Sequence, residues 1–334
     1  MAPGSPGSAT LETTATRLAA ILAEGGEGVE GEGSSRLVAE PGVAPVAFAR
    51  APHPPDDVWA VDGGQATVAD ARCLRVVVTR VARVRLRAGE SVLEEEGPLE
   101  AHLVGVGQDP AGLQALADRG LELPSRTAVD ADLLRDAAEW AALRRAVEDA
   151  DRGGLVLVDG DLFPDPRIPE EHAAAVIRRA LERGVVVAGV TKHSSLARGG
   201  APLVASLEAT ADRQPGLDRA RWWAPVARSS PRCQLELRVV VARLDPAARF
   251  AFRVDLPAEA DAVTVLAQLA ALSDDAAFPG YPYPLAVADR LAACPPWLRD
   301  EARLELDDHL ERLGVDVEQR ERCFSDRHRL MERG

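Results

Sequence analysis

The sequence has little that would support cysteine chemistry or a membrane span. Its four cysteines, Cys73, Cys233, Cys294 and Cys323, are scattered and form no CxxC pair, which argues against zinc sites and disulfide frameworks and favours a reducing compartment. No apolar run approaches the roughly 18 residues of a membrane helix, and the N-terminus lacks a basic region followed by an apolar core. We therefore expect a soluble cytoplasmic protein with no secretory signal and no membrane association.

Lysine is almost absent. Of the 39 basic residues, Lys192 is the single lysine and the other 38 are arginines. The formal net charge of −14 would count against nucleic acid as a ligand, because affinity for phosphates comes from lysine and arginine. Part of that acidity lies in the glycine-rich stretch EGGEGVEGEGSS at 24–35, which is not expected to belong to the folded body. A local concentration of positive charge would remove the objection.

Two apolar stretches each end in an Asp-Gly pair. The run at 155–158 ends at Asp159-Gly160, and the run at 58–61 ends at Asp62-Gly63. Continuous apolar runs are typical of strands that are covered on both faces, and Asp-Gly marks the place where the chain turns. Ligands of open α/β sheets bind at the carboxyl ends of the strands. Two aspartates at such ends can share one metal ion.

The strand that ends at Asp159 is followed by a helix and another apolar strand. Residues 170–183 have the apolar spacing of an amphipathic helix. Residues 185–190 are wholly apolar and lead into Lys192. A strand, helix and strand in this order form a βαβ unit with parallel strands. We therefore expect Lys192 to lie at the same sheet edge as Asp159.

Two further segments predict strands, the first of them with a basic face. In RCLRVVVTRVARVRLR, residues 72–87, the arginines Arg83, Arg85 and Arg87 alternate with apolar residues, so one face is either a solvated surface or a stripe that contacts phosphates. Residues 90–103 predict one more strand.

Residues 234–244 and 249–256 predict a hairpin with Phe250 facing inward and Arg253 and Asp255 facing outward, whereas Trp222 and the following tryptophan lie in a predicted loop.

The order of the motifs resembles the NurA family of DNA-repair nucleases. The matching elements, in chain order, are VDG at 61–63, Arg135 and Glu139 on a predicted helix over 130–149, LVDG at 157–160, GVTK at 189–192, Phe252-Arg253, and GYPYPL at 280–285. Asp-Gly turns are common, but their order together with GYPYPL is fairly specific. The resemblance covers residues 58–291.

This resemblance implies a fold, an activity and partners. The fold would be α/β, with an RNase H-like core in which helices flank a mixed central sheet. The activity would be that of a manganese-dependent deoxyribonuclease, with Mg²⁺ as the alternative ion, of the 5′–3′ exonuclease and single-strand endonuclease type. It would process DNA double-strand break ends as a ring-like homodimer together with a hexameric HerA-type ATPase.

The resemblance also implies roles for individual residues. Asp62, Glu139 and Asp159 match the family's metal-binding acids, and Lys192 matches its active-site lysine. Phosphodiester hydrolysis suits such a set, because carboxylates hold a hard divalent ion and an ammonium group stabilises charge on phosphorus.

Three more residues in the shared motifs, Arg253, Tyr281 and Tyr283, are expected to bind substrate. Two positions depart from the family pattern: Gly64 replaces the usual serine, and Asp289 stands where the helix after GYPYPL usually has histidine. Asp289 would then be either an additional metal ligand or a mark of altered or lost activity.

The sequence divides into three expected segments: a flexible low-complexity extension with a short helix at 1–50, a NurA-like nuclease domain at 51–295, and a helical segment at 296–334. Two other functions remain open. One is a catalytically inactive scaffold that binds DNA or a partner. The other, less favoured, is an actin-like sugar kinase or ATPase, because residues 61–67 resemble its first phosphate loop while residues 159–162 lack the small and hydroxyl residues of the second.

Overall fold

The computed structural model describes residues 11–23, 29–31, 34–105 and 110–325. The chain forms two compact units, a first unit of residues 1–54, 160–162 and 188–283 and a second unit of residues 55–159, 163–187 and 284–334. Much of the low-complexity stretch that the sequence predicts near the N-terminus lies outside the described residues. Within the described residues, no helix has the length and apolar character needed to cross a membrane.

The second unit is built on a mixed sheet. Its two longest strands, β3 (Asp57–Asp70) and β4 (Arg75–Arg87), pair antiparallel, and β7 (Leu155–Asp159) runs parallel to β3. The strand expected over 90–103 is two strands, β5 (Glu90–Glu96) and β6 (Glu100–Val104), which both pair with β4. They are separate because Pro98 has no N–H with which to continue the ladder.

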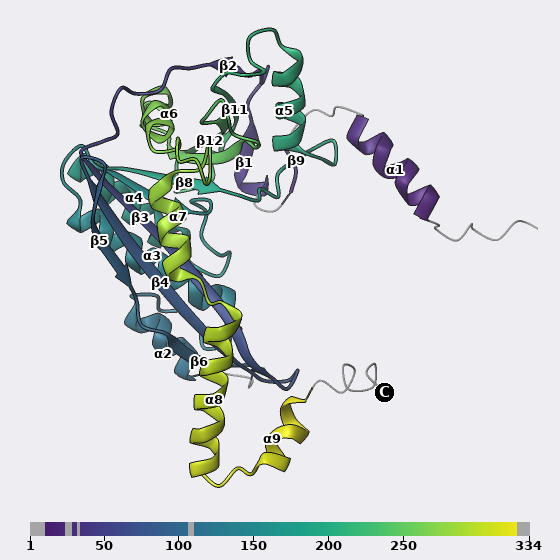
Figure 1. Cartoon of the computed structure of the whole chain (residues 1–334), viewed down its shortest axis with the longest axis vertical. Coiled ribbons are helices and arrows are strands. Elements are labelled where there is room, and N and C mark those ends of the chain that lie inside the picture. The colour runs from purple at the N-terminus through teal and green to yellow at the C-terminus, as the bar shows by residue number, and fades with distance from the viewer. Residues whose placement is uncertain (1–10, 24–28, 32–33, 106–109, 326–334) are drawn as a thin grey trace, which may run out of the picture. The chain divides into compact units, whose positions relative to one another are not determined.

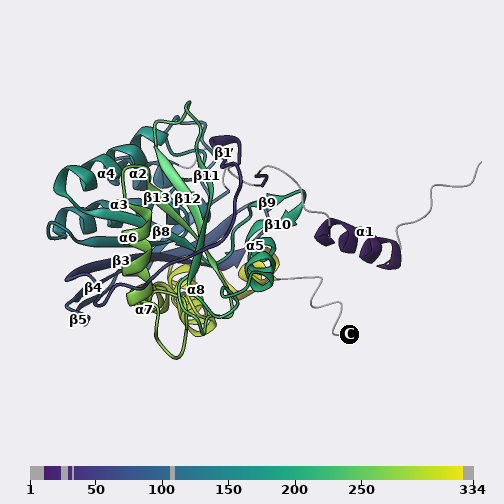
Figure 2. The same cartoon turned by 90° about the horizontal axis from the view of Figure 1, so that it is seen from above.

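Helices cover both faces of this sheet. On one side lie α3 (Ala131–Asp149), which packs on β3 and β4, and α4 (Glu170–Arg183); on the other lie α7 (Tyr283–Ala292) and α8 (Pro296–Arg312) (Figures 1 and 2). The remaining helices of the unit are α2 (Pro110–Asp118) and α9 (Val317–Phe324).

Local sequence sets the limits of two of these helices. α3 begins where the Asp130 carboxylate accepts a hydrogen bond from the Leu133 N–H at 2.9 Å. α4 ends at Gly184, whose φ of 69° is the left-handed conformation that a helix end favours.

The first unit contains a second set of strands. Their order is β1 (Leu37–Ala39), β11 (Trp222–Ser229), β12 (Leu237–Arg243), β13 (Phe252–Pro257) and β8 (Val186–Thr191), of which residues 188–191 belong to this unit, and β2 (Val46–Ala47) also pairs with β11. The smaller elements are α1 (Leu11–Ala23), a 3₁₀ turn (Ser34–Arg36), β9 (Ala197–Arg198), β10 (Ala201–Pro202), α5 (Leu203–Arg213) and α6 (Ala262–Ala271).

The structure confirms the predicted hairpin, as β12 and β13 pair antiparallel, but corrects the segment before it. Trp222 is not in a loop: it is fully buried at the start of β11, where it pairs with Arg243 of β12. The burial alternates from Trp222 to the half-buried Trp223 and the buried Ala224, which is the period of a strand with one covered face. The neighbouring arginines had obscured this pattern.

The directions predicted for three residues of the hairpin are wrong. Phe250 is 56% exposed rather than inward, whereas Arg253 and Asp255 are buried rather than outward. Every residue of β13 after Phe252 is buried, so both faces of this strand are covered and alternation does not mark a solvent-facing side. Arg253 tolerates burial because its Nε and Nη2 each donate to Asp255 at 2.8 Å and its Nη1 donates to Asp161 at 3.1 Å.

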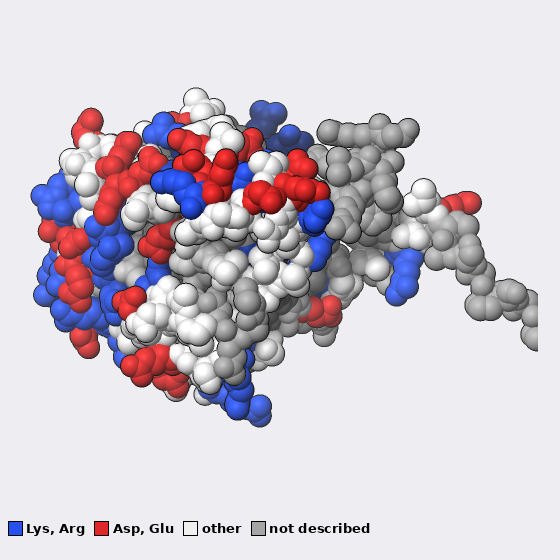
Figure 3. Space-filling model, turned by 90° about the horizontal axis from the view of Figure 1, so that it is seen from below, with Lys and Arg blue, Asp and Glu red and all other residues white. Residues whose placement is uncertain are grey.

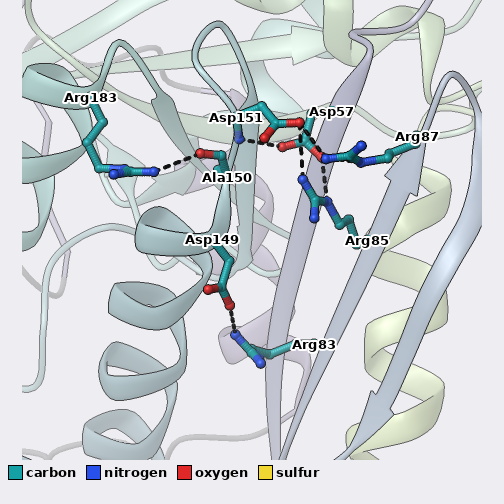
Figure 4. Close-up of polar contacts among 8 residues, drawn as sticks. All are labelled: Asp57, Arg83, Arg85, Arg87, Asp149, Ala150, Asp151 and Arg183. Carbon is teal, nitrogen blue, oxygen red and sulfur yellow. Dashed lines mark hydrogen bonds and ion pairs between the residues drawn. The ribbon is translucent and has the colours of Figure 1, made fainter.

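The arginines of β4 form an ion-pair network with acids around the end of α3 (Figure 4). Arg85 Nε donates to the buried Asp57 at 2.7 Å, and Arg87 Nη2 donates to Asp151 at 2.6 Å. Arg83 Nη1 donates to Asp149, the last residue of α3, at 2.8 Å. The sequence left open a solvated face or a stripe that contacts phosphates; the structure shows arginines whose charge is balanced within the second unit.

Asp57 is the central acceptor of this network. Its other oxygen, Oδ2, accepts the backbone N–H of Asp151 at 2.8 Å. We predict that Asp57→Ala lowers the free energy of unfolding by about 3 kcal/mol, because it leaves the largely buried Arg85 guanidinium and a backbone N–H without their acceptor. Chemical denaturation monitored by circular dichroism measures the change.

Arg87→Gln is the matched control, since that side chain is half exposed and its ion pair should contribute no more than about 0.5 kcal/mol. Equal losses in the two variants would contradict the central position of Asp57.

Candidate metal centre

The pairing of β3 with β7 brings two aspartates together. The parallel register matches Val58 with Leu155 and continues to Val61 with Val158, and the next residues are Asp62 and Asp159. Asp62 is buried, and its Oδ1 accepts the N–H of Gly63 at 2.7 Å. The two aspartates lie side by side, as expected, but the predicted turn at Asp62-Gly63 is wrong: β3 continues to Asp70, so Asp62 lies within its strand, whereas Asp159 is the last residue of β7.

A third carboxylate joins them from a helix. Asp289, on α7, offers a carboxylate oxygen that lies within 4.8 Å of one oxygen from Asp62 and one from Asp159. Asp62 is buried, Asp159 is half-buried and Asp289 is exposed, so the group extends from the core to the surface. We call these three residues the aspartate triad.

Glu139 lies apart from the aspartate triad. It is buried on α3, and a Cβ atom added to Gly63 would lie 2.4 Å from its Oε1. Adjacent residues of a strand point to opposite faces, so Glu139 meets β3 on the face opposite the Asp62 side chain. The family resemblance grouped Glu139 with Asp62 and Asp159, but the sequence did not show that Glu139 approaches β3 from the opposite face.

The Glu139 carboxyl group is in an unusual environment. Its buried Oε1 has no hydrogen-bond partner within the described residues, and Arg135 Nε lies 3.8 Å away. Burial raises the pKa of Glu139 well above its ordinary value, the charge of Arg135 opposes that rise, and Asp136, Asp62 and Asp159 add to it. A buried oxygen without a hydrogen bond can coordinate a cation.

The donor set fits a hard divalent cation. Mg²⁺, Mn²⁺ and Ca²⁺ prefer carboxylate oxygens, whereas structural zinc sites use cysteine and histidine. The aspartate triad offers three carboxylates, and the Oε1 of Glu139, which has no hydrogen bond within the described residues, lies beside Gly63, the residue after Asp62. The chain can therefore hold such an ion where Asp62, within β3, lies beside the end of β7.

The other residues predicted for the site lie in the first unit. Lys192 Nζ is 5.0 Å from the ring centroid of Tyr281, a cation–π distance, and the Tyr281 ring packs against Phe252 with centroids 5.4 Å apart. Tyr281 is buried, whereas Tyr283, at the start of α7, is 41% exposed. The two tyrosines of the chain therefore differ in their access to a ligand.

Sequence reasoning missed the role of Asp161 and Asp255. Together with Arg253 they form a clamp on the turn at 160–162, which directly follows Asp159 in the chain: Arg253 binds both acids, and Asp255 also accepts the Leu162 N–H at 3.2 Å. Burial raises the pKa of Asp255, and the charge of Arg253 opposes that rise. The signal was present, because opposite charges two residues apart share one face of a strand.

A cavity of about 540 Å³ lies beside β4, α2 and α3 in the second unit. Five arginines and three acids line it. Its arginines include Arg83 and Arg119, which pair with Glu95 and Glu100. The aspartate triad does not line this cavity, so cavity size alone would not reveal the candidate centre.

Comparison with known proteins places the chain in a family. Residues 56–294 match the NurA domain. Comparison with curated proteins gives no match. The crystal structure of the NurA nuclease from Sulfolobus solfataricus is similar with a TM-score of 0.57 at 14% identity, over 90% of this chain and 95% of that chain.

Two other crystal structures are similar over much of their length. A second NurA structure has a TM-score of 0.46 at 10% identity, over 80% of this chain and 90% of that chain. The catalytic domain of human endonuclease V has a TM-score of 0.41 at 13% identity, over 89% of this chain and 99% of that chain.

The domain match covers well over half of the chain, and the sheet flanked by helices is the RNase H-like α/β arrangement expected from the motifs. The matched range includes Asp62, Asp159, the helix of Glu139 and the GYPYPL segment. The chain belongs to the NurA family of nucleases.

Proposed function

We propose that the protein hydrolyses phosphodiester bonds of DNA with a divalent metal ion, Mn²⁺ or Mg²⁺, held by the aspartate triad. The observation that carries this proposal is the convergence of three carboxylates from β3, β7 and α7 within 4.8 Å. A bound ion would supply Lewis acidity and neutralise charge on the phosphate. Asp62 and Asp159 would hold it rigidly, since Asp62 lies within β3, where it pairs with Ala82, and Asp159 is the last residue of β7.

Glu139 completes the proposed set from the other face of β3. Its unpaired Oε1 lies beside Gly63, the residue next to Asp62, and Arg135 one helical turn earlier partly balances its charge. A carboxylate that is buried without a hydrogen bond keeps its capacity to accept a cation. We propose that Glu139 adds an oxygen to the centre when the ion binds.

Lys192 is the proposed electrostatic catalyst. It follows β8, and the order β7, α4, β8 favours a right-handed crossover that puts the ends of both strands at one edge. An ammonium group concentrates its charge on one atom and can stabilise the extra negative charge of the transition state.

The three residues of the first unit that were expected to bind substrate are proposed to have different roles. Tyr283 has the exposed ring and can stack on a base. Tyr281 packs under Lys192, and Arg253 holds the turn after Asp159, so both would shape the substrate site from within.

The proposed substrate is DNA, and delivery by a partner suits the charge of the chain. The net charge is −14, and basic and acidic side chains are interspersed over the face drawn in Figure 3. Such a surface attracts duplex DNA weakly. With the family relationship, this supports a homodimer that acts on break ends as a 5′–3′ exonuclease and single-strand endonuclease fed by a HerA-type ATPase. Sedimentation of the chain at micromolar concentration tests the dimer.

The two alternatives receive less support. A phosphate loop of the actin-like kinase type requires a turn, yet residues 61–67 lie inside the continuous strand β3. In a catalytically inactive scaffold the three clustered carboxylates would only destabilise the fold, because bringing like charges together costs free energy unless a cation binds.

The aspartates give the direct test of the proposed activity. We predict that Asp62→Asn and Asp159→Asn each lower the rate of DNA cleavage by at least about a hundredfold, because each removes a charged ligand. The metal-free variants should be at least as resistant to thermal unfolding as the parent, since one like charge is gone. End-labelled single- and double-stranded DNA, incubated with Mn²⁺, Mg²⁺ or a chelator, provides the measurement. Parental cleavage by both variants would contradict the proposal.

Lys192 gives a second test, in which arginine is the informative substitution. We predict that Lys192→Arg lowers the cleavage rate at least about tenfold, equivalent to roughly 1.4 kcal/mol of transition-state stabilisation, while DNA affinity changes little. Guanidinium is planar and spreads its charge, so it should not replace the ammonium group. Lys192→Ala should be only modestly slower than Lys192→Arg. Cleavage at the parental rate by Lys192→Arg would show that any surface cation suffices.

A further inference from the structure

We propose that Gly64 is a positioning residue for the metal centre: its missing side chain lets the end of α7 pack on β3, and this contact brings Asp289 to Asp62 and Asp159. The inference rests on the proposed function, in which the aspartate triad holds the ion. Gly64 would not touch the ion, but it would allow the three aspartates to come together.

The contact at Gly64 is between backbones. A Cβ atom at this position would lie 2.0 Å from the carbonyl oxygen of Ala292 and 2.8 Å from its carbonyl carbon. A distance this short cannot be relieved by rotating a side chain, because both atoms belong to the end of α7. Any residue other than glycine must move the helix end away from the strand or distort β3.

The neighbouring glycine has a different role. A Cβ atom at Gly63 would lie 2.4 Å from Oε1 and 2.7 Å from Cγ of the buried Glu139, so it would meet a side chain of α3 rather than the backbone of α7. Gly63 and Gly64 point to opposite faces of β3, so only Gly64 shares the face of the Asp62 side chain. The end of α7, the helix that carries Asp289, meets this face at Gly64.

The last turn of α7 transmits the contact to Asp289. The N–H of Ala293 donates to the carbonyl oxygen of Asp289 at 2.9 Å, so the segment that touches Gly64 is bonded to the backbone of the ligand residue. Metal sites need their ligands held within about 0.5 Å of the productive geometry. A clash at 2.0 Å requires a shift on the order of 1 Å, since ordinary contacts begin above 3 Å.

Binding of Mn²⁺ to the full-length chain tests this inference without a cleavage assay. Isothermal titration calorimetry compares the parent with Gly64→Ala, Asp289→Asn and the double variant. We expect Gly64→Ala and Asp289→Asn each to weaken Mn²⁺ binding at least about tenfold. The double variant should be within about twofold of Asp289→Asn, because two changes that act through one ligand are not additive.

A longer side chain at position 289 should reverse the effect. In the Gly64→Ala background, Asp289→Glu adds one methylene and should recover at least about threefold of the lost Mn²⁺ affinity, because it extends the reach of the displaced helix. In the parent chain the same change should weaken Mn²⁺ binding, because there the distance between α7 and β3 suits an aspartate at position 289. A residue that mattered only for stability would not produce this reversal.

Gly105→Ala is the matched control. A Cβ atom there would lie 2.7 Å from the carbonyl oxygen of Cys73, and φ is +94°, so the variant should be destabilised. Gly105 follows β6, whose last residue pairs with Arg75, whereas Asp62 pairs with Ala82 further along β4. Its Mn²⁺ affinity should equal that of the parent.

The outcomes separate the two proposals. Parental Mn²⁺ affinity in Gly64→Ala, or fully additive losses in the double variant, would overturn the role of Gly64 and leave the aspartate centre standing. A parent chain that binds no Mn²⁺ would overturn the proposed function and this inference with it. If Gly64→Ala does not fold, Asp289→Glu in the parent chain provides the test. Mn²⁺ binding by this variant that equals or exceeds that of the parent would contradict the claim that the distance between α7 and β3 suits an aspartate at position 289.

Discussion

The parallel pairing of β3 with β7 is the constraint on which the candidate centre depends. Carboxylates of like charge repel, so the aspartate triad is held together by the backbone rather than by any attraction among its members. The register that ends at Val61 and Val158 fixes two of the three acids. The close approach of α7 to β3 supplies the third, and the repulsion stored in this arrangement is what a divalent cation would relieve.

Some of the centre could be predicted from the sequence because the signals are local. Apolar runs followed by Asp-Gly single out Asp62 and Asp159, although β3 continues past Asp62 to Asp70, and a βαβ order predicts that Asp159 and Lys192 share a sheet edge. The helix of Glu139 and its Asp130 cap follow from spacing and capping preferences. Asp289 was indicated by family resemblance, since one acid on a distant helix carries no pattern of its own.

The remaining features depend on contacts between segments that are far apart in the chain. Alternation along the chain predicted that Arg253 faces solvent, but both faces of β13 are covered, and Asp255 and Asp161 balance the charge of the buried guanidinium. The face from which Glu139 meets β3 is a matter of helix packing. The two departures from the family pattern, Gly64 and Asp289, looked independent in the sequence, whereas the structure joins them through the carbonyl of Ala292.

The location of a bound ion tests the account most directly. Crystals of the full-length chain soaked with Mn²⁺ and measured at a wavelength where manganese scatters anomalously should show a peak within roughly 2.0–2.6 Å of carboxylate oxygens from Asp62, Asp159 and Asp289. Soaked crystals that lack a peak at this position, or that show manganese bound only elsewhere, would contradict the claim that these three aspartates form a metal centre.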